Sequence, residues 1–289
     1  MNDQLTIDGQ PAEMLVRYVA SLIDQGIIGS ARCTQTTGST NQDALEEWRS
    51  DRAFALPRLH VTETQTAGRG RRGRTWLRGE RSLAFSVMLD LIDGDDARAS
   101  DTNVGSLSLA VGVGAAEALE FFSSPSPIGL KWPNDICIQT ADGSLKKLGG
   151  ILIEAVSQRA GSVVVGIGVN LTRPPSIQQG FPAVSLGELT TKDVRDEEVL
   201  AAVVQSVIES VAEWKSDAKS LLTRFRKRCL LTGREITLRQ LNEQTRERAF
   251  VGVCHGIAED GSLRIMNQST MRQFHTGEIS DVRIRRHDG

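Results

Sequence analysis

The chain has 289 residues, 39% of them hydrophobic and 24% charged, which is long enough for one large domain or for a large and a small one. These proportions exclude collagen-like and largely disordered classes. The formal net charge of -2 argues against a general nucleic-acid binder. No apolar run reaches the roughly 18 residues of a membrane span, no signal peptide is recognisable, and the four scattered cysteines predict reduced thiols. We therefore expect a cytoplasmic protein.

Two helices are predicted near the start of the chain. Apolar residues at helical spacing indicate the first within residues 11–26. A second is expected to follow Ser39, and Thr40 and Asp43 are predicted to form its capping box. The stretch before these motifs is too short for the three helices of a helix-turn-helix domain, so we expect no sequence-specific DNA binding.

Strands are expected next, because apolar residues alternate at 58–64 and 82–91. A largely buried helix at 105–122 follows, packed on the resulting sheet. Three further strands are predicted at about 128–138, 145–156 and 162–171.

The C-terminal part changes in texture. A clear amphipathic helix at 196–215 continues to about residue 228. After Gly233, short alternating runs at 234–239, 248–257, 262–267 and 270–284 predict a small β-barrel. We predict an α+β fold with a mixed, largely antiparallel sheet and packed helices over residues 1–230, and the barrel over 231–289.

The segment Gly68–Gly73 reads GRGRRG and satisfies the GxGxxG pattern of dinucleotide-binding folds. Only residues 75–81 separate it from the next strand, too few for the crossover helix which that fold needs. The two strands are therefore expected to pair as an antiparallel hairpin. Its arginines can present donor forks to phosphate, and its glycines favour a flexible loop that orders on an anionic ligand. A solvated basic hairpin tip, or an RNA contact, is the alternative.

Three other features are compatible with a binding site. The KWPND sequence at residues 131–135 is either a turn with a buried tryptophan or part of a site. Lys147 enters a hydrophobic strand, which is costly unless its ammonium meets an anion or faces solvent. Gly166, Gly168 and Asn170 fall on one face of an apolar strand, which leaves a slot for a flat ligand or allows tight packing.

In this order the motifs resemble those of the bacterial biotin–protein ligases. The similarity runs from about residue 35 to the C-terminus and implies a monofunctional ligase without an N-terminal DNA-binding domain. It also implies a biotin/lipoate ligase-like catalytic domain over 1–230 and an SH3-like barrel over 231–289. The matching sequences are GSTN at 38–41, ETQTAGRGRRGRTW at 63–76, KWPND at 131–135, KLGGIL at 147–152 and GIGVN at 166–170.

The resemblance also implies an activity. Biotin and MgATP would give biotinyl-5′-AMP and pyrophosphate, and biotin would then pass to a lysine of a biotin carboxyl carrier domain. Mg²⁺ would arrive with ATP rather than at a dedicated protein site, and the family's sheet edges permit a homodimer. A lipoate–protein ligase of the same fold is the nearest rival, but its arginine-led triple-glycine loop and following His-Asp are missing. An RNA-binding protein would leave Lys147 unexplained.

Roles for single residues follow from their positions in these motifs. Lys147, bridging the biotin carboxylate and the α-phosphate, and Arg71 are the expected catalytic residues. Asp135 is expected near the acceptor lysine or Mg²⁺, and whether Arg283 reaches the nucleotide stays open. Biotin contacts are expected from Ser39, Thr40, Asn41, Gln65, Arg69, Gly70, Arg71, Lys147, Gly166 and Gly168. Nucleotide contacts are expected from Arg71, Arg74, Trp76, Lys147 and Asn170.

Overall fold

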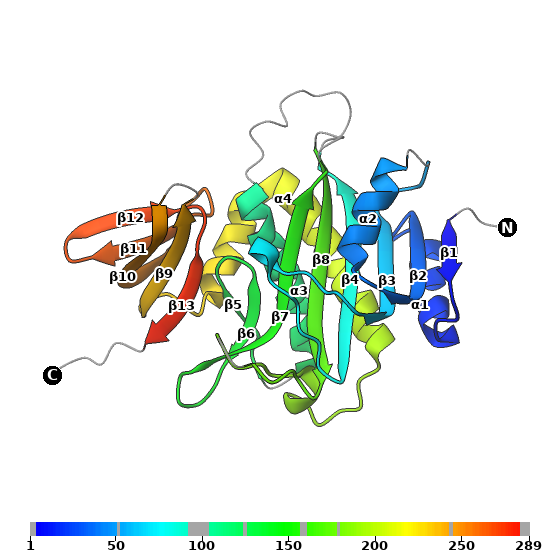
Figure 1. Ribbon diagram of the computed structural model, residues 1–289, viewed down its shortest axis with the longest axis horizontal. Coiled ribbons are helices and arrows are strands. Elements are labelled where there is room, and N and C mark those ends of the chain that lie inside the picture. Colours follow the sequence, from blue (N-terminus) through cyan, green and yellow to red (C-terminus); the bar gives the residue numbers. More distant parts are fainter. Residues whose placement is uncertain are drawn as a thin grey trace.

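An eight-stranded sheet forms the centre of the molecule, with strand order β1-β2-β3-β4-β8-β7-β6-β5 (Figure 1). The computed structural model describes residues 4–50, 53–91, 104–123, 126–156, 161–177, 180–242 and 245–283. The strands are β1 (Leu5–Asp8), β2 (Ser30–Thr37), β3 (Arg58–Gln65), β4 (Arg81–Asp90), β5 (Gly129–Lys131), β6 (Asp135–Gln139), β7 (Leu145–Ala155) and β8 (Ser162–Thr172).

Pairing in this sheet is mixed. The strands β1, β2 and β3 run parallel to one another, and every other neighbouring pair is antiparallel. The pair β3–β4 is among the antiparallel ones, so the arginine-rich segment between them is a hairpin connection and not a dinucleotide crossover. The expected mixed, largely antiparallel sheet is confirmed.

The helices divide between the two faces of the sheet. On one face α1 (Glu13–Asp24), α3 (Val104–Ser123) and α4 (Asp196–Arg228) share the main core with alternate residues of β8, and α2 (Thr40–Arg49) packs on the other face. Among the described helices α3 is the one long and apolar enough to cross a membrane, but 67% of that stretch is buried inside the structure. This burial is typical of a core helix.

A second sheet lies at the far end of the molecule, beyond β5 (Figure 1). Its five antiparallel strands are ordered β12-β11-β10-β9-β13. This sheet is consistent with the expected SH3-like domain, although within the described residues it does not close: β12 and β13 lie at its opposite edges, and the run expected at 270–284 is divided between them. The strands are β9 (Glu235–Asn242), β10 (Thr245–Ile257), β11 (Leu263–Asn267), β12 (Thr270–Phe274) and β13 (Glu278–Arg283).

Two local predictions are wrong. The strand expected over 128–138 is the hairpin β5–β6, whose turn contains Pro133, a residue that cannot donate to a ladder. The capping box of α2 does not form: the Asp43 carboxylate accepts from Thr37 at 2.6 Å, and the Thr40 N–H donates to Gln65 at 3.0 Å. Gln65 of β3 thus accepts the hydrogen bond from the helix N-terminus that the side chains of α2 itself were predicted to accept.

Both strands before β3 escaped prediction, whereas the reduced thiols are confirmed: all four cysteines are free. The division of the chain near residue 230 stays a prediction, with α4 ending at Arg228 and β9 beginning at Glu235.

Candidate active site

Small residues line up across three strands on the face of the sheet that carries α2. Gly168 of β8 is in register with Ala84 of β4 on one side and with Gly150 of β7 on the other. The indole of Trp76 lies on this floor, since a Cβ atom added at Gly168 would stand 2.6 Å from its Cε2. The floor therefore exists because these positions lack bulky side chains.

The next row of the floor supports the start of α2. A Cβ atom at Gly166 would lie 2.0 Å from Oδ1 of Asn41, so only glycine lets that amide approach the sheet. The buried Ser86 hydroxyl contacts the same Oδ1 at 2.6 Å and the Thr40 hydroxyl at 2.7 Å. The space left by the alternating glycines is thus filled at its base by Asn41 and Trp76, as the tight-packing alternative predicts.

Above this floor lies a cavity of about 780 Å³. Every residue for which the sequence predicted a biotin, nucleotide, catalytic or acceptor/Mg²⁺ role lines it, whereas Arg283, whose role was left open, does not. The fourteen are Ser39, Thr40, Asn41, Gln65, Arg69, Gly70, Arg71, Arg74, Trp76, Asp135, Lys147, Gly166, Gly168 and Asn170.

A buried carboxylate shared by two lysines stands at one end of the cavity. Asp135 contacts Lys147 Nζ at 2.5 Å and Lys131 Nζ at 2.6 Å. Burial would raise the pKa of Asp135, but the two ammonium groups hold it well below its usual range. Burial likewise disfavours the charged form of Lys147, yet Asp135 outweighs it and raises the pKa of that lysine. Lys147 is therefore a cation beside an aromatic floor, its Nζ 5.5 Å from the Trp76 ring centre.

A β-bulge places Lys147 in the site. Between β6 and β7 the register shifts, so that Ile136 faces Gly149 and Cys137 faces Lys147, with Leu148 as the extra residue. With strict alternation along β7, the side chain of Lys147 would lie on the other face of the sheet from Gly150. The bulge turns it to the same face.

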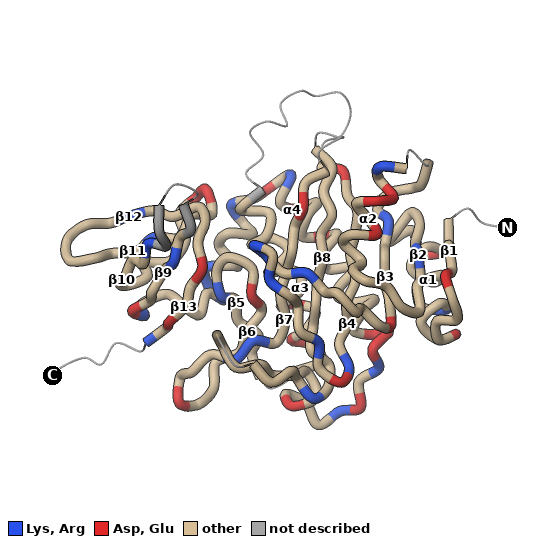
Figure 2. The backbone as a smooth tube through the Cα atoms, viewed as in Figure 1, with Lys and Arg blue, Asp and Glu red and all other residues tan. Residues whose placement is uncertain are grey.

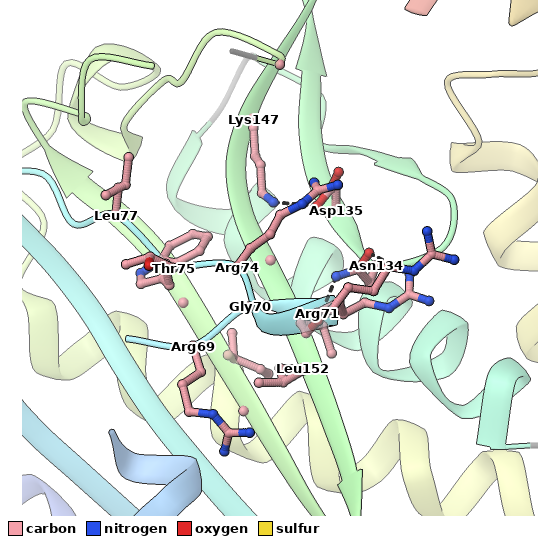
Figure 3. A pocket seen from close by; sticks show the side chains of 18 of the residues that line it. Arg69, Gly70, Arg71, Arg74, Thr75, Leu77, Asn134, Asp135, Lys147 and Leu152 are labelled. Carbon is pink, nitrogen blue, oxygen red and sulfur yellow. Dashed lines mark hydrogen bonds and ion pairs between the residues drawn. The ribbon is translucent and has the colours of Figure 1, made fainter. Parts of the chain in front are cut away.

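The arginine-rich loop closes the cavity from above. Figure 2 shows its basic residues in front of β7 and β8, and Figure 3 shows the guanidinium of Arg71 beside Asn134, to whose Oδ1 it donates at 3.2 Å. Burial and the nearby charge of Arg72 lower the pKa of Arg71. A site in which cations crowd one another favours an anion.

The loop also reaches the second sheet. Arg72 donates to Thr276 at 3.2 Å, and Arg74 forms an ion pair with Glu278. Residues 277–280 consequently contribute to the cavity wall. This contribution of the C-terminal sheet was not predicted.

Chemically, the cavity suits an elongated ligand with an uncharged polar end and an anionic end. Hydroxyl and amide groups gather near the start of α2, and Lys147, Arg71 and Arg74 surround the opposite part. Among the described side chains no three of His, Cys, Asp and Glu are grouped as metal ligands would be. Asp135, paired to two lysines, is no free general base.

The fold and this cavity define a catalytic domain of the biotin/lipoate ligase type. The family model for biotin/lipoate A/B protein ligases matches residues 33–170, which contain most of the cavity wall. Residues 33–170 therefore form a domain of the biotin/lipoate A/B protein ligase type.

Relatives agree with this assignment. The chain is 29% identical to a biotin–[acetyl-CoA-carboxylase] ligase of Mycobacterium tuberculosis, over 78% of this chain and 79% of that protein. It is 27% identical to the bifunctional ligase/repressor BirA of Escherichia coli, over 96% and 83%. Among solved structures, the biotin protein ligase of Aquifex aeolicus in complex with biotin and ATP superposes with a TM-score of 0.70 at 28% identity, over 88% of this chain and 99% of that one.

Several residues of the site had no predicted role. Ser86 is a fully buried polar residue on the site face of β4, and its polarity amid an apolar strand was a usable signal. The ring centre of Phe181 lies 4.7 Å from Lys131 Nζ. This residue lies in a segment without periodicity, so the sequence gave no signal for its role. Glu154, behind the cavity wall, contacts both Asn41 and Arg69.

Proposed function

We propose that this protein is a biotin–protein ligase. It activates biotin with ATP to biotinyl-5′-AMP and pyrophosphate, and then transfers biotin to a lysine of a biotin carboxyl carrier domain. The observation that carries the proposal is the convergence of Lys147, Arg71 and Arg74 on a cavity whose other end offers the polar groups of Thr40 and Gln65. The printed names of the relatives, and the biotin and ATP bound to the Aquifex aeolicus ligase, point to the same ligands.

The first half-reaction needs positive charge between two anions. The biotin carboxylate must approach the α-phosphate of ATP, and their repulsion must be offset by fixed cations. Lys147 can turn from Asp135 to a ligand without leaving that carboxylate unpaired. The Nζ of Lys131 also lies 2.6 Å from Asp135 and stays there as its partner. Arg71, held by Asn134, supplies a planar fork for phosphate oxygens.

Two buried polar atoms support a nucleotide base in the cavity. Nε1 of Trp76 and Oδ1 of Asn170 have no hydrogen-bond partner within the described part of the chain. Buried polar groups are rarely left unpaired in native proteins. Adenine offers both ring acceptors and an amino donor, and we assign it to the part of the cavity that Trp76 and Asn170 line.

Biotin is assigned to the end formed by α2 and β3. Ser39, Thr40 and Gln65 line this end with hydroxyl and amide groups that match the donors and acceptors of a ureido ring. The hydrophobic chain of the ligand would then lie along Ile151 and Leu152 of β7, towards Lys147.

Mg²⁺ is expected to enter on the ATP phosphates. The cavity carboxylate Asp135 is engaged by two lysines, and the described residues form no group of three metal ligands. The remaining proposals concern context: cytoplasmic location, which suits free thiols, no sequence-specific DNA binding, and a homodimer as a permitted assembly.

The function is tested by incubating the protein with biotin and MgATP and measuring biotinyl-adenylate and pyrophosphate, with lipoate and octanoate as parallel substrates. We expect adenylate from biotin alone, and biotin transfer when an acceptor carrier domain is added. Absence of adenylate with biotin, or preferential activation of lipoate, would overturn the proposal.

A further inference from the structure

One carboxylate joins the two protein segments that enclose the polar end of the cavity. We propose that Glu154 is a positioning residue for biotin, which fixes the Asn41 amide and holds the arginine-rich loop closed over the ligand. The inference rests on the proposed function for its substrate. Its geometry is independent of that function.

Glu154 lies close to the cavity but outside its wall. It follows Leu152, which lines the cavity, by two residues on β7, and so points to the same face of the sheet. Its register partner on β8 is Val164, whose other partner is Met88 of β4. The glutamate therefore stands one row beyond the Gly166 row, and its side chain is only 22% exposed.

The first contact of Glu154 fixes an amide. Asn41 Nδ2 donates to Glu154 Oε2 at 3.0 Å and to the Leu152 carbonyl at 3.3 Å, while its Oδ1 accepts from Ser86 at 2.6 Å. A carboxylate accepts only, so it forces the donor end of the amide towards itself. The acceptor end then faces the sheet at Gly166.

The second contact of Glu154 holds the loop. Arg69 donates to both carboxylate oxygens, from Nη2 to Oε1 at 2.9 Å and from Nη1 to Oε2 at 3.1 Å, and Nη1 also reaches Gln42 at 3.2 Å. Such bidentate pairs define orientation as well as charge. Figure 3 shows Arg69 pointing away from Lys147 and Arg74, so its role differs from that of the phosphate-facing cations.

These contacts connect loop closure to the orientation of the biotin site. The far side of the loop is held at Asn134 and at the C-terminal sheet, through Arg71 and Arg72. Arg69 ties the near side to β7 through the same carboxylate that orients Asn41. Loss of the charge on Glu154 should therefore loosen the loop and the amide together.

The direct test is the isosteric variant Glu154→Gln. We expect the KM for biotin and the release rate of biotinyl-adenylate each to rise about five-fold, the scale of one partly exposed ion pair, with kcat at saturating biotin and the KM for ATP unchanged. Glu154→Asp, which keeps the charge, should fall between Glu154→Gln and wild type. The control Glu13→Gln removes an exposed carboxylate paired with Arg17 and should change nothing.

A double-mutant cycle separates this role from general destabilisation. Arg69→Gln combined with Glu154→Gln should weaken biotin binding no more than Glu154→Gln alone, because Glu154→Gln already removes the ion pair that Arg69→Gln removes. Additive effects, or an unchanged KM for biotin in folded Glu154→Gln, would overturn the proposal.

A readout without substrates keeps the inference distinct from the assigned function. Trypsin cleavage after the arginines at 69–74 should be about five-fold faster in ligand-free Glu154→Gln than in wild type or Glu13→Gln. Equal cleavage rates would refute the proposal. A wild-type protein that makes no adenylate would refute the ligase assignment while leaving the cleavage result to decide the role of Glu154.

Discussion

Lys147→Gln separates the chemistry of the site from its stability. In wild type the ammonium lies 2.5 Å from Asp135, and its side chain is 31% exposed. Removing one partner of a buried pair commonly costs about 3–5 kcal/mol because the other charge is stranded. Here Lys131 stays at 2.6 Å from the same carboxylate, so we expect a loss of only about 1 kcal/mol in the free energy of unfolding.

The loss in rate should be far larger. Lys147 is the cation proposed to stand between the carboxylate and the α-phosphate, and deleting one such charge-stabilising group typically costs about 3–4 kcal/mol in the transition state, roughly 10²- to 10³-fold in rate. Pyrophosphate release with saturating biotin and MgATP measures this, alongside urea unfolding. Lys146→Gln is the matched control, since strand alternation places that lysine on the opposite face of β7 and it does not line the cavity. Normal pyrophosphate release by folded Lys147→Gln would refute the mechanism.

Two further predictions concern packing and pH. Gly168→Val should displace the Trp76 indole, whose Cε2 lies 2.6 Å from the position of an added Cβ, and lower adenylate formation at least about ten-fold with a change in tryptophan fluorescence; unchanged fluorescence and rate would contradict the packing. Burial alone would raise the pKa of Glu47, but hydrogen bonds from His60 and Arg58 lower it to about 2, while burial lowers the pKa of His60. Both shifts mean that the unfolded chain binds protons more readily, so stability should fall as pH drops below the unfolded His value of 6.5 and further between 4.5 and 2. Urea midpoints across pH 3–8 test this, and a His60→Gln variant with the same profile as wild type would argue against the histidine's part.

Short motifs made much of the site predictable. The hairpin followed from a count of residues between Gly73 and the next strand, because a parallel crossover needs more chain than is available. The site roles followed from resemblance, and the cavity gathers all the residues concerned. Their individual contacts did not follow: the sequence left open whether Gly166 makes room for a ligand or for tight packing, and in the structure it makes room for Asn41.

The features that the sequence did not predict depend on interactions between segments distant in the chain. The capping box of α2 was plausible locally, but Gln65 lies 25 residues away and takes the Thr40 N–H. The C-terminal sheet completes the cavity through Glu278, which pairs with an arginine some two hundred residues earlier. Local patterns do not carry such information, because each of these groups has its partner on a segment that only the tertiary fold brings close.

The orientation of Lys147 is the clearest case of a feature that local sequence patterns predict wrongly. Counting alternate positions along β7 from Gly150 places its side chain with the core helices, where an ammonium would be costly. The extra residue Leu148 reverses that outcome, and Leu148 itself is fully buried. The bulge lies opposite the neighbouring strand β6, which begins at Asp135, directly after the turn that contains Pro133. The KWPND segment therefore supplies Asp135 at the start of β6, and the bulge in β7 brings Lys147 onto the same face as the glycine floor, within reach of that carboxylate.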